Sequence, residues 1–156
     1  MSRTHRPALP VLILLVLACA SACQPSDRRP GLWLAGEPAP LPEDWSFTDA
    51  HGEIAIEVRT PYALPHSVTI WCASADGSLF VAARDPEEKR WPGWVERDPE
   101  VRLAIDGRLY EARLERIDDP DRIAPVRRAY AAKYRLDDPP PPDAPPLRYW
   151  QVVSRG

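Results

Sequence analysis

The chain has few of the residues from which metal sites and membrane spans are built. Its 156 residues include three cysteines and three histidines, and no Cys/His cluster has the spacing of zinc ligands, which argues against a zinc site. The longest apolar run, residues 9–18, is well short of the roughly 20 residues that a membrane-spanning helix needs. There is also no excess of positive charge. With 20 basic and 23 acidic residues the net charge is −3, which argues against nucleic acid as a partner because phosphate binding needs a basic face.

The first 23 residues have the pattern of an export signal. Arg3 and Arg6 precede the apolar run 9–18, and small residues with two cysteines follow it, as in a secretory signal. A cysteine at this exit resembles the signal of bacterial lipoproteins, whose cysteine thiol receives a diacylglyceryl group and becomes the mature N-terminus. We favour Cys23, which leaves the longer apolar region and follows three small residues. Cys19 remains the alternative, and so does an ordinary cleaved signal with an incidental cysteine.

The predicted anchor implies a location and a first partner, the membrane. Gln24 directly after the cysteine resembles lipoproteins sent to the outer membrane, so we expect the domain to face the periplasm there. Several acyl chains hold a protein on a membrane much more firmly than one chain does. If Cys23 is acylated, Cys72 is the only free thiol and no internal disulfide can form. Cys72 lies between Trp71 and Ala73, a context typical of a small buried hydrophobic residue.

Proline sets the internal boundaries. After the signal peptide, residues 1–22, the segment 23–43 contains five prolines and is predicted to be a Pro-rich tether. The remaining residues, 44–156, are enough for one domain. A second proline-rich stretch, 137–146, is predicted to be a polyproline connector that leads to the last strand.

Apolar residues alternate with polar ones along much of the domain, which predicts strands. Six segments are predicted: 53–60, 66–73, 78–83, 101–105, 108–117 and 149–153. Asp76-Gly77 and Asp106-Gly107 are tight-turn signals, so two hairpins are expected. Six antiparallel strands with two short helices suggest a small barrel that closes its own edges.

The two helices are predicted at 91–98 and from Asp119-Pro120 to about residue 135. An aspartate cap followed by proline is typical of a helix start. Apolar side chains at steps of three and four form one buried stripe on the second helix: Ile123, Val126, Tyr130 and Tyr134. Pro125 interrupts this pattern, so we expect a break or kink there.

Three motifs between residues 66 and 134 carry a resemblance to a known superfamily. They are the Trp91-x7-Pro99-x-Val101 spacing, the hairpin 105–113 (IDGRLYEAR), and Asp119-Pro120 leading to residues 128–134 (RAYAAKY). Their order and spacing resemble the pyridoxamine-phosphate-oxidase-like split β-barrels, and among these the deazaflavin-dependent nitroreductases. The resemblance implies a mainly β domain with two short helices (α+β), a six-stranded antiparallel split β-barrel, and FMN or a deazaflavin as cofactor.

The resemblance also implies which residues hold the cofactor. The phosphate-bearing tail would contact Arg84, Lys89 and Arg90, and the ring would lie near Thr69, Trp71 and Trp91. Two departures concern this site. The superfamily's basic, glycine-containing loop is replaced by residues 60–65 (TPYALP), and its asparagine three residues past the tryptophan is Trp94. The loop change removes charge and flexible amides from a place where phosphates would need them.

Two functions remain open from the sequence. The first is an oxidoreductase that reduces a quinone or a nitroaromatic compound by hydride transfer from the cofactor. His66 would act in it as a general acid, although a histidine at a strand start is also typical of a surface or capping position. The second is a non-catalytic binding or interaction lipoprotein that kept the barrel and lost the cofactor, which export favours because a cytosolic cofactor must be carried out. A flat aromatic ligand is the expected small-molecule partner, and the resemblance leaves a homodimer open. The tryptophans could line such a ligand site or fill the core.

Overall fold

The computed structural model describes residues 31–156. Eight strands form one sheet: β1 (Glu37–Ala39), β2 (Ile54–Val58), β3 (His66–Ile70), β4 (Cys72–Ala75), β5 (Ser78–Arg84), β6 (Glu100–Ile105), β7 (Arg108–Ile117) and β8 (Leu147–Val153). The helices are η1 (Ser46–Ala50), η2 (Pro86–Glu88), α2 (Arg90–Val95) and α3 (Pro120–Tyr134). Every predicted strand and both predicted helices are found, so the mainly β split-barrel class is confirmed. The predicted signal peptide and both candidate lipidation cysteines lie outside the described residues.

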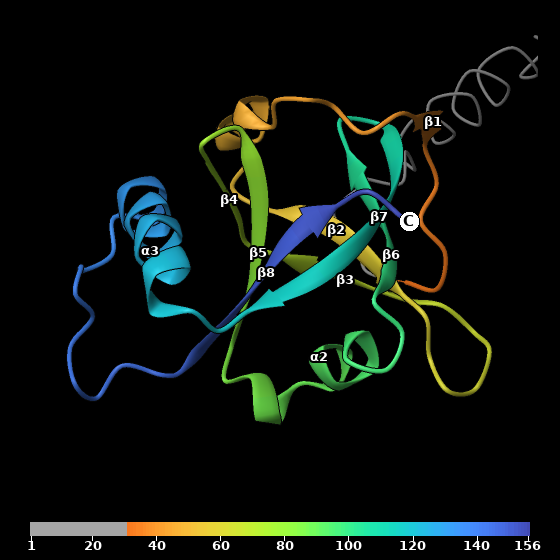
Figure 1. Ribbon diagram of the computed structural model, residues 1–156. Coiled ribbons are helices and arrows are strands. Elements are labelled where there is room, and N and C mark those ends of the chain that lie inside the picture. The colour runs from red at the N-terminus through yellow and green to blue at the C-terminus, as the bar shows by residue number, and fades with distance from the viewer. Residues whose placement is uncertain (1–30) are drawn as a thin grey trace, which may run out of the picture.

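The strand order is β3-β2-β6-β7-β8-β5-β4, and short β1 pairs in parallel with β7. All other pairs are antiparallel. The hydrogen-bonded path ends at β3 and β4, so the expected closure of the barrel is not found. These two end strands derive from the single predicted strand 66–73, which is interrupted at Trp71 and bends there from one edge of the sheet to the other (Figure 1).

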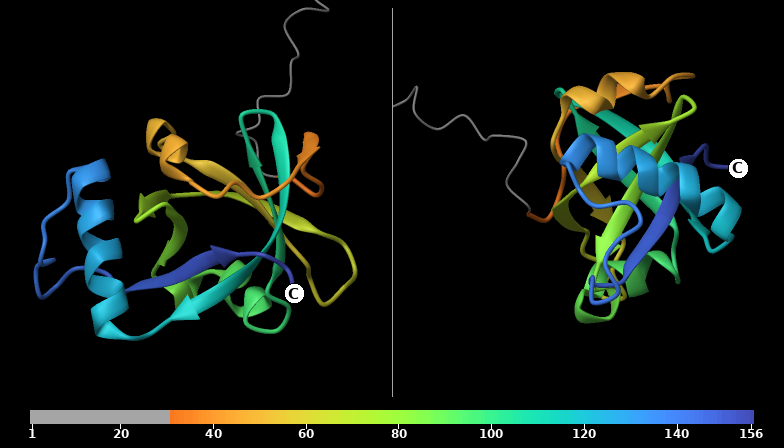
Figure 2. Two further views of the ribbon diagram at one scale, coloured as in Figure 1. Left: turned by 45° about the horizontal axis from the view of Figure 1, so that its top comes forward. Right: turned by 90° about the vertical axis from the view of Figure 1, so that its left-hand side faces the viewer.

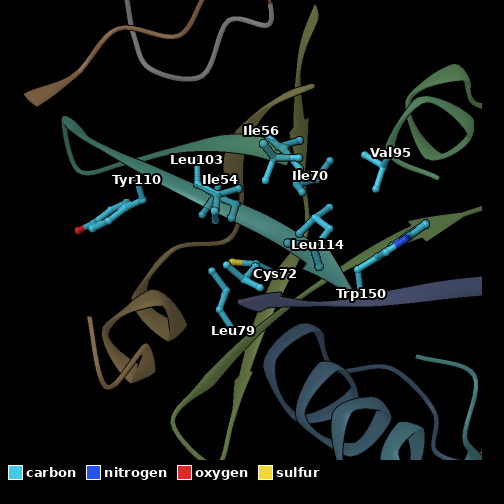
Figure 3. Close-up of a cluster of buried hydrophobic side chains, with 14 of the residues drawn as sticks. Ile54, Ile56, Ile70, Cys72, Leu79, Val95, Leu103, Tyr110, Leu114 and Trp150 are labelled. Carbon is cyan, nitrogen blue, oxygen red and sulfur yellow. The ribbon is translucent and has the colours of Figure 1, made fainter. Parts of the chain in front are cut away.

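The period-two pattern sorts side chains to the two faces of the sheet. Inward-facing residues of β2, β5 and β8 form the barrel core, in which Trp150 lies close to Leu114 (Figure 3). The alternate residues Phe80, Ala82 and Tyr149 point outward and form a second cluster under α3. This outer cluster exists because α3 covers that part of the sheet from outside, with the segment 135–146 on the far side of the helix (Figure 2).

Both predicted hairpin turns are confirmed by their backbone conformation. Asp76 and Gly77 have φ values of 50° and 75°, and Asp106 and Gly107 have 50° and 72°. Two successive residues of positive φ match the right-handed twist of the strands that they join.

The described part of the predicted tether differs from expectation. Residues 31–43 lie along the barrel: β1 pairs with β7, and the backbone N–H of Leu34 donates to Oε2 of Glu57 at 2.6 Å. Proline-rich sequence is compatible with this course because an edge segment needs few backbone donors. Only residues 23–30 of the predicted tether remain outside the described residues.

The expected break at Pro125 is also not found, and α3 is continuous from Pro120 to Tyr134. Pro125 lies in the second turn, where its missing N–H affects one carbonyl near the exposed helix start. Asp119 caps the helix by accepting a hydrogen bond from the Asp121 backbone at 3.0 Å.

Candidate functional site

A cavity with a volume of about 500 Å³ lies where α3, the end of β5, the start of β8 and the segment 135–146 meet. We call it the α3 cavity. Its aromatic lining is Trp71, Tyr130 and Tyr149, its basic lining is Arg84, Arg127 and Arg135, and Leu136, Leu147 and prolines of the connector complete the wall. Its volume is within the range of small-molecule and cofactor sites, and an aromatic wall with a few polar groups is their usual composition.

Trp71 presents a flat apolar surface at the cavity. The bend between β3 and β4 places its indole on the ring of Tyr134, with the two rings nearly parallel and their centroids 4.4 Å apart. Nevertheless the side chain remains 39% exposed, and Leu136 and Leu147 in the same wall are also exposed. Large apolar side chains that gather at one exposed hollow are typical of a ligand site.

Tyr149 contributes a polar group without a partner. The residue is 4% exposed, and its hydroxyl makes no hydrogen bond within the described chain. Burial raises the pKa of Tyr149 above its ordinary value, with a smaller opposing effect of Arg127. The hydroxyl is therefore neutral at physiological pH and can donate one hydrogen bond to a ligand.

The three arginines of the cavity differ in their neighbours. Arg127 pairs with Asp138 of the connector, and Nε of Arg84 lies 3.7 Å from the carboxylate of Asp85. Arg135, in the left-handed conformation that ends α3, has no acidic partner among residues 31–156. Asp137 also lines the cavity, so the three arginines are matched by three nearby carboxylates, and the unpaired guanidinium of Arg135 is far from a full phosphate site.

Lys133 and Tyr134 fix the end of α3 against β4. The Lys133 ammonium donates to the backbone oxygens of Cys72 at 2.7 Å and Thr48 at 2.9 Å, and the Tyr134 hydroxyl accepts from the backbone N–H of Cys72 at 3.0 Å. These contacts place the ring of Tyr134 behind Trp71.

The Cys72 thiol is fully buried and faces the barrel core (Figure 3). Burial raises its pKa, and the nearby Lys133 ammonium offsets this in part. The protonated thiol is a packing group, as its sequence context predicted.

Two of the seven predicted site residues, Trp71 and Arg84, line the α3 cavity. Lys89 is exposed but lies close to the cavity, because its ammonium donates to the backbone oxygen of Arg84, which is part of the cavity wall. Arg90 is exposed at the start of α2, and Thr69 lies on β3 opposite Ala55. Neither belongs to the cavity wall.

Trp91 and His66 are not brought to this cavity. Trp91 is 5% exposed and packs against Trp150 in the core, with ring centroids 5.1 Å apart. It fills the core here, and its place beside a cofactor ring stays a prediction. His66 contacts Trp94 edge-on at 5.2 Å. The five residues of β3 separate it from Trp71 by roughly 17 Å at the rise of a strand, so His66 lies at the far end of β3 from the α3 cavity, and its role as a general acid stays a prediction.

Sequence reasoning missed Arg127, Arg135, Tyr130 and Tyr149 as site residues. Tyr130 was expected only in the buried stripe, and the connector was expected only as a spacer. The available signal was the combination of a basic, tyrosine-containing helix with a proline-rich segment that immediately follows it.

Comparison with known proteins places the chain in a family. A family model described as "Uncharacterized protein conserved in bacteria (DUF2255)" matches residues 47–141. The chain belongs to this family. The match covers the sheet from β2 to β7, both α-helices and the first half of the connector. Among curated proteins no match is found.

Solved structures of low sequence identity share the fold. Conserved hypothetical protein Rv2991 from Mycobacterium tuberculosis has a TM-score of 0.54 at 19% identity, over 70% of this chain and 77% of that one. A "putative pyridoxamine 5'-phosphate oxidase" from Listeria innocua has 0.52 at 14%, over 69% and 87%. A "putative 5-nitroimidazole antibiotic resistance protein" from Bacteroides thetaiotaomicron has 0.52 at 10%, over 82% and 84%. The chain therefore has the pyridoxamine-phosphate-oxidase-like split-barrel fold.

Proposed function

We propose that this chain is a lipid-anchored envelope protein whose split barrel binds a flavin-type ring in the α3 cavity and reduces a quinone or a nitro compound. The observation that carries the proposal is the cavity itself, with an exposed indole, an unpartnered Tyr149 hydroxyl and the free guanidinium of Arg135. Fold neighbours with an oxidase-type and a nitroimidazole-resistance description support the reaction class. Fold alone does not determine activity.

The residues present fit the ring better than the phosphate. Trp71 would stack on the ring, Tyr149 would donate a hydrogen bond to it, and Arg135 would attract the anionic tail. The apolar wall would exclude water from the ring face. A reduced flavin or deazaflavin bound there would supply the hydride.

Titration with FMN tests the binding part of the proposal. The soluble chain from residue 24 is expected to quench flavin fluorescence in a saturable way, and Trp71→Ala is expected to weaken binding about tenfold. Arg135→Gln is expected to weaken binding of FMN and leave riboflavin, which lacks the phosphate, unchanged. Arg128→Gln is the matched control, because Arg128 is an exposed arginine of the same helix outside the cavity wall. Wild-type protein that binds neither flavin at tens of micromolar would contradict the proposal.

A second candidate is a binding or interaction lipoprotein without a redox cofactor. It is favoured by the carboxylates next to Arg84 and Arg127 and by the scatter of the other predicted phosphate residues. An uncharged aromatic ligand would then occupy the cavity. Retained riboflavin binding without any preference for FMN, and no quinone reduction, would favour this candidate.

The anchor is tested separately by labelling growing cells with a palmitate analogue. We expect the label on the wild-type chain, its loss in Cys23→Ser and its retention in Cys19→Ser. The reverse result would assign the anchor to Cys19, and an unlabelled wild-type chain would contradict the anchor.

A further inference from the structure

The most exposed large apolar side chains of the described residues lie in two segments, at the start of the described chain and in the loop 59–65 between β2 and β3. Trp33 is 61% exposed, Tyr62 58%, Leu32 50% and Leu64 46%. We call these four residues the tether-side patch. Burying such side chains is favourable, and a cluster of them on a surface marks an interaction site.

Backbone contacts place the two halves of the patch at the same end of the β2–β3 ladder. Gly31 pairs with Ser67 through two hydrogen bonds of 2.8 Å, and Leu34 is bonded to Glu57. Leu32 and Trp33 are therefore held beside the Glu57–Ser67 pair of β2 and β3. The next pair of the ladder, Val58 and His66, is the last before the loop 59–65 that contains Tyr62 and Leu64. Both segments lie on the side of the molecule opposite α3 (Figure 1).

The same contacts shorten the connection to the predicted anchor. The sequence alone suggested that residues 23–43 separate the domain from the membrane, which corresponds to about 70 Å of extended chain. Because the chain is fixed to the barrel from Gly31 onward, Cys23 is separated from it by at most about 28 Å. The patch thus contains Leu32 and Trp33, which are among the described residues nearest to the predicted anchor along the chain.

The chemistry of the patch suits a lipid interface. Tryptophan and tyrosine combine an apolar ring with a polar group and favour the boundary between lipid tails and headgroups. The neighbouring carboxylate of Glu57 is neutralised by Arg102, whose guanidinium lies within 2.6 Å and 2.7 Å of the two carboxylate oxygens. The Glu57–Arg102 pair therefore has no net charge that would repel an anionic membrane.

We propose that the tether-side patch lies on the lipid surface of the bilayer that holds the anchor, so that the α3 cavity on the opposite side faces away from the membrane. The inference rests on the proposed lipid anchor but not on a bound cofactor.

Photo-crosslinking of the full-length chain in its own membranes tests this orientation. Trp33→benzoylphenylalanine and Tyr62→benzoylphenylalanine are expected to give about tenfold more phospholipid adduct than Leu136→benzoylphenylalanine. Leu136 is the matched control, an apolar residue that is 41% exposed and lies at the end of α3. Adducts are measured by mass spectrometry, and each sample is also labelled with a palmitate analogue.

The outcomes separate the inference from the anchor. Palmitate-labelled protein with lipid adducts at positions 33 and 62 supports the inference. Labelled protein whose adducts at these positions join two copies of the chain overturns it in favour of self-association. Labelled protein with equal adducts at all three positions, or with none, also overturns it. An unlabelled wild-type chain overturns the anchor and with it the inference.

Discussion

At the scale of single residues, the Tyr149 hydroxyl stands out as the buried side-chain polar group of residues 31–156 that has no hydrogen-bond partner. A buried hydroxyl without a partner lowers stability, by about 1 kcal/mol or more, and a folded protein tolerates this where the group serves another purpose. Tyr149 differs here from Tyr130, whose hydroxyl lies 3.1 Å from the backbone oxygens of Trp71 and Phe80.

Tyr149→Phe is therefore expected to leave the free energy of unfolding unchanged or to raise it by about 1 kcal/mol, because no hydrogen bond is lost. Binding of FMN is expected to weaken about three- to tenfold. Urea denaturation and flavin fluorescence measure the two effects. Tyr130→Phe is the control and should lose stability. Unchanged flavin affinity in Tyr149→Phe would show that the hydroxyl does not contact the ligand.

Buried thiol and phenol groups also predict a response to alkaline pH. Burial raises the pKa values of Cys72, Tyr130 and Tyr149 above their ordinary values. These groups therefore lose their protons at a lower pH in the unfolded chain than in the folded protein. The stability that they contribute is complete below the unfolded pKa values and is lost as the pH rises through the folded ones. The free energy of unfolding should fall from about pH 8 upward, as the thiol and then the phenols of the unfolded chain ionise. Tyr149→Phe should reduce this fall, and an identical pH curve for wild type and variant would argue against the burial effect.

At the scale of elements, β1 depends on a close backbone approach. A Cβ added to Gly36 would lie 2.9 Å from the carbonyl oxygen of Gly107 and 3.1 Å from the carbonyl carbon of Arg108. Backbone atoms at this distance cannot move aside cheaply, so β1 must separate from β7.

We expect Gly36→Ala to lower the free energy of unfolding by about 1–3 kcal/mol. Gly52→Ala is the matched control, because a Cβ at Gly52 meets no atom within 4 Å; it should be neutral. Equal urea midpoints of the two variants would mean that β1 does not contribute to stability in solution.

At the scale of the whole molecule, the structure assigns residues 31–43 to the domain. They cover an outer apolar cluster of Ala55, Ala104 and Leu109, against which Leu34 packs. A chain that starts at residue 31 should be as stable as one that starts at residue 24. A chain that starts at residue 44 should lose about 2 kcal/mol or more, because this cluster is exposed and β1 is removed. Thermal unfolding of the three chains measures this, and equal midpoints would support the tether that the prolines suggested.

The described part of the molecule contains no helix long and apolar enough to cross a membrane, and in residues 31–156 no group of histidine, cysteine and acidic residues could hold a metal ion. The membrane attachment that we propose depends on the predicted lipid at Cys23. The proposed orientation joins the two ends of the domain in one arrangement, with the tether-side patch on the bilayer and the α3 cavity open to solutes.

Local sequence patterns determined the elements of this protein. Alternating apolar residues, two Asp-Gly turns and the Asp119 cap specify strands, hairpins and a helix start through contacts within a few residues. These elements were found near their predicted positions, except that the predicted strand 66–73 is divided at Trp71 into β3 and β4. The cavity could not be predicted in this way. Trp71, Arg135 and Tyr149 are far apart in the chain, and only the packing of α3 outside β5 and β8 makes them neighbours. The same holds for residues 31–43, because proline-rich sequence is compatible both with a free tether and with an edge segment, and only the exposed edge of β7 and the Glu57 carboxylate decide between the two.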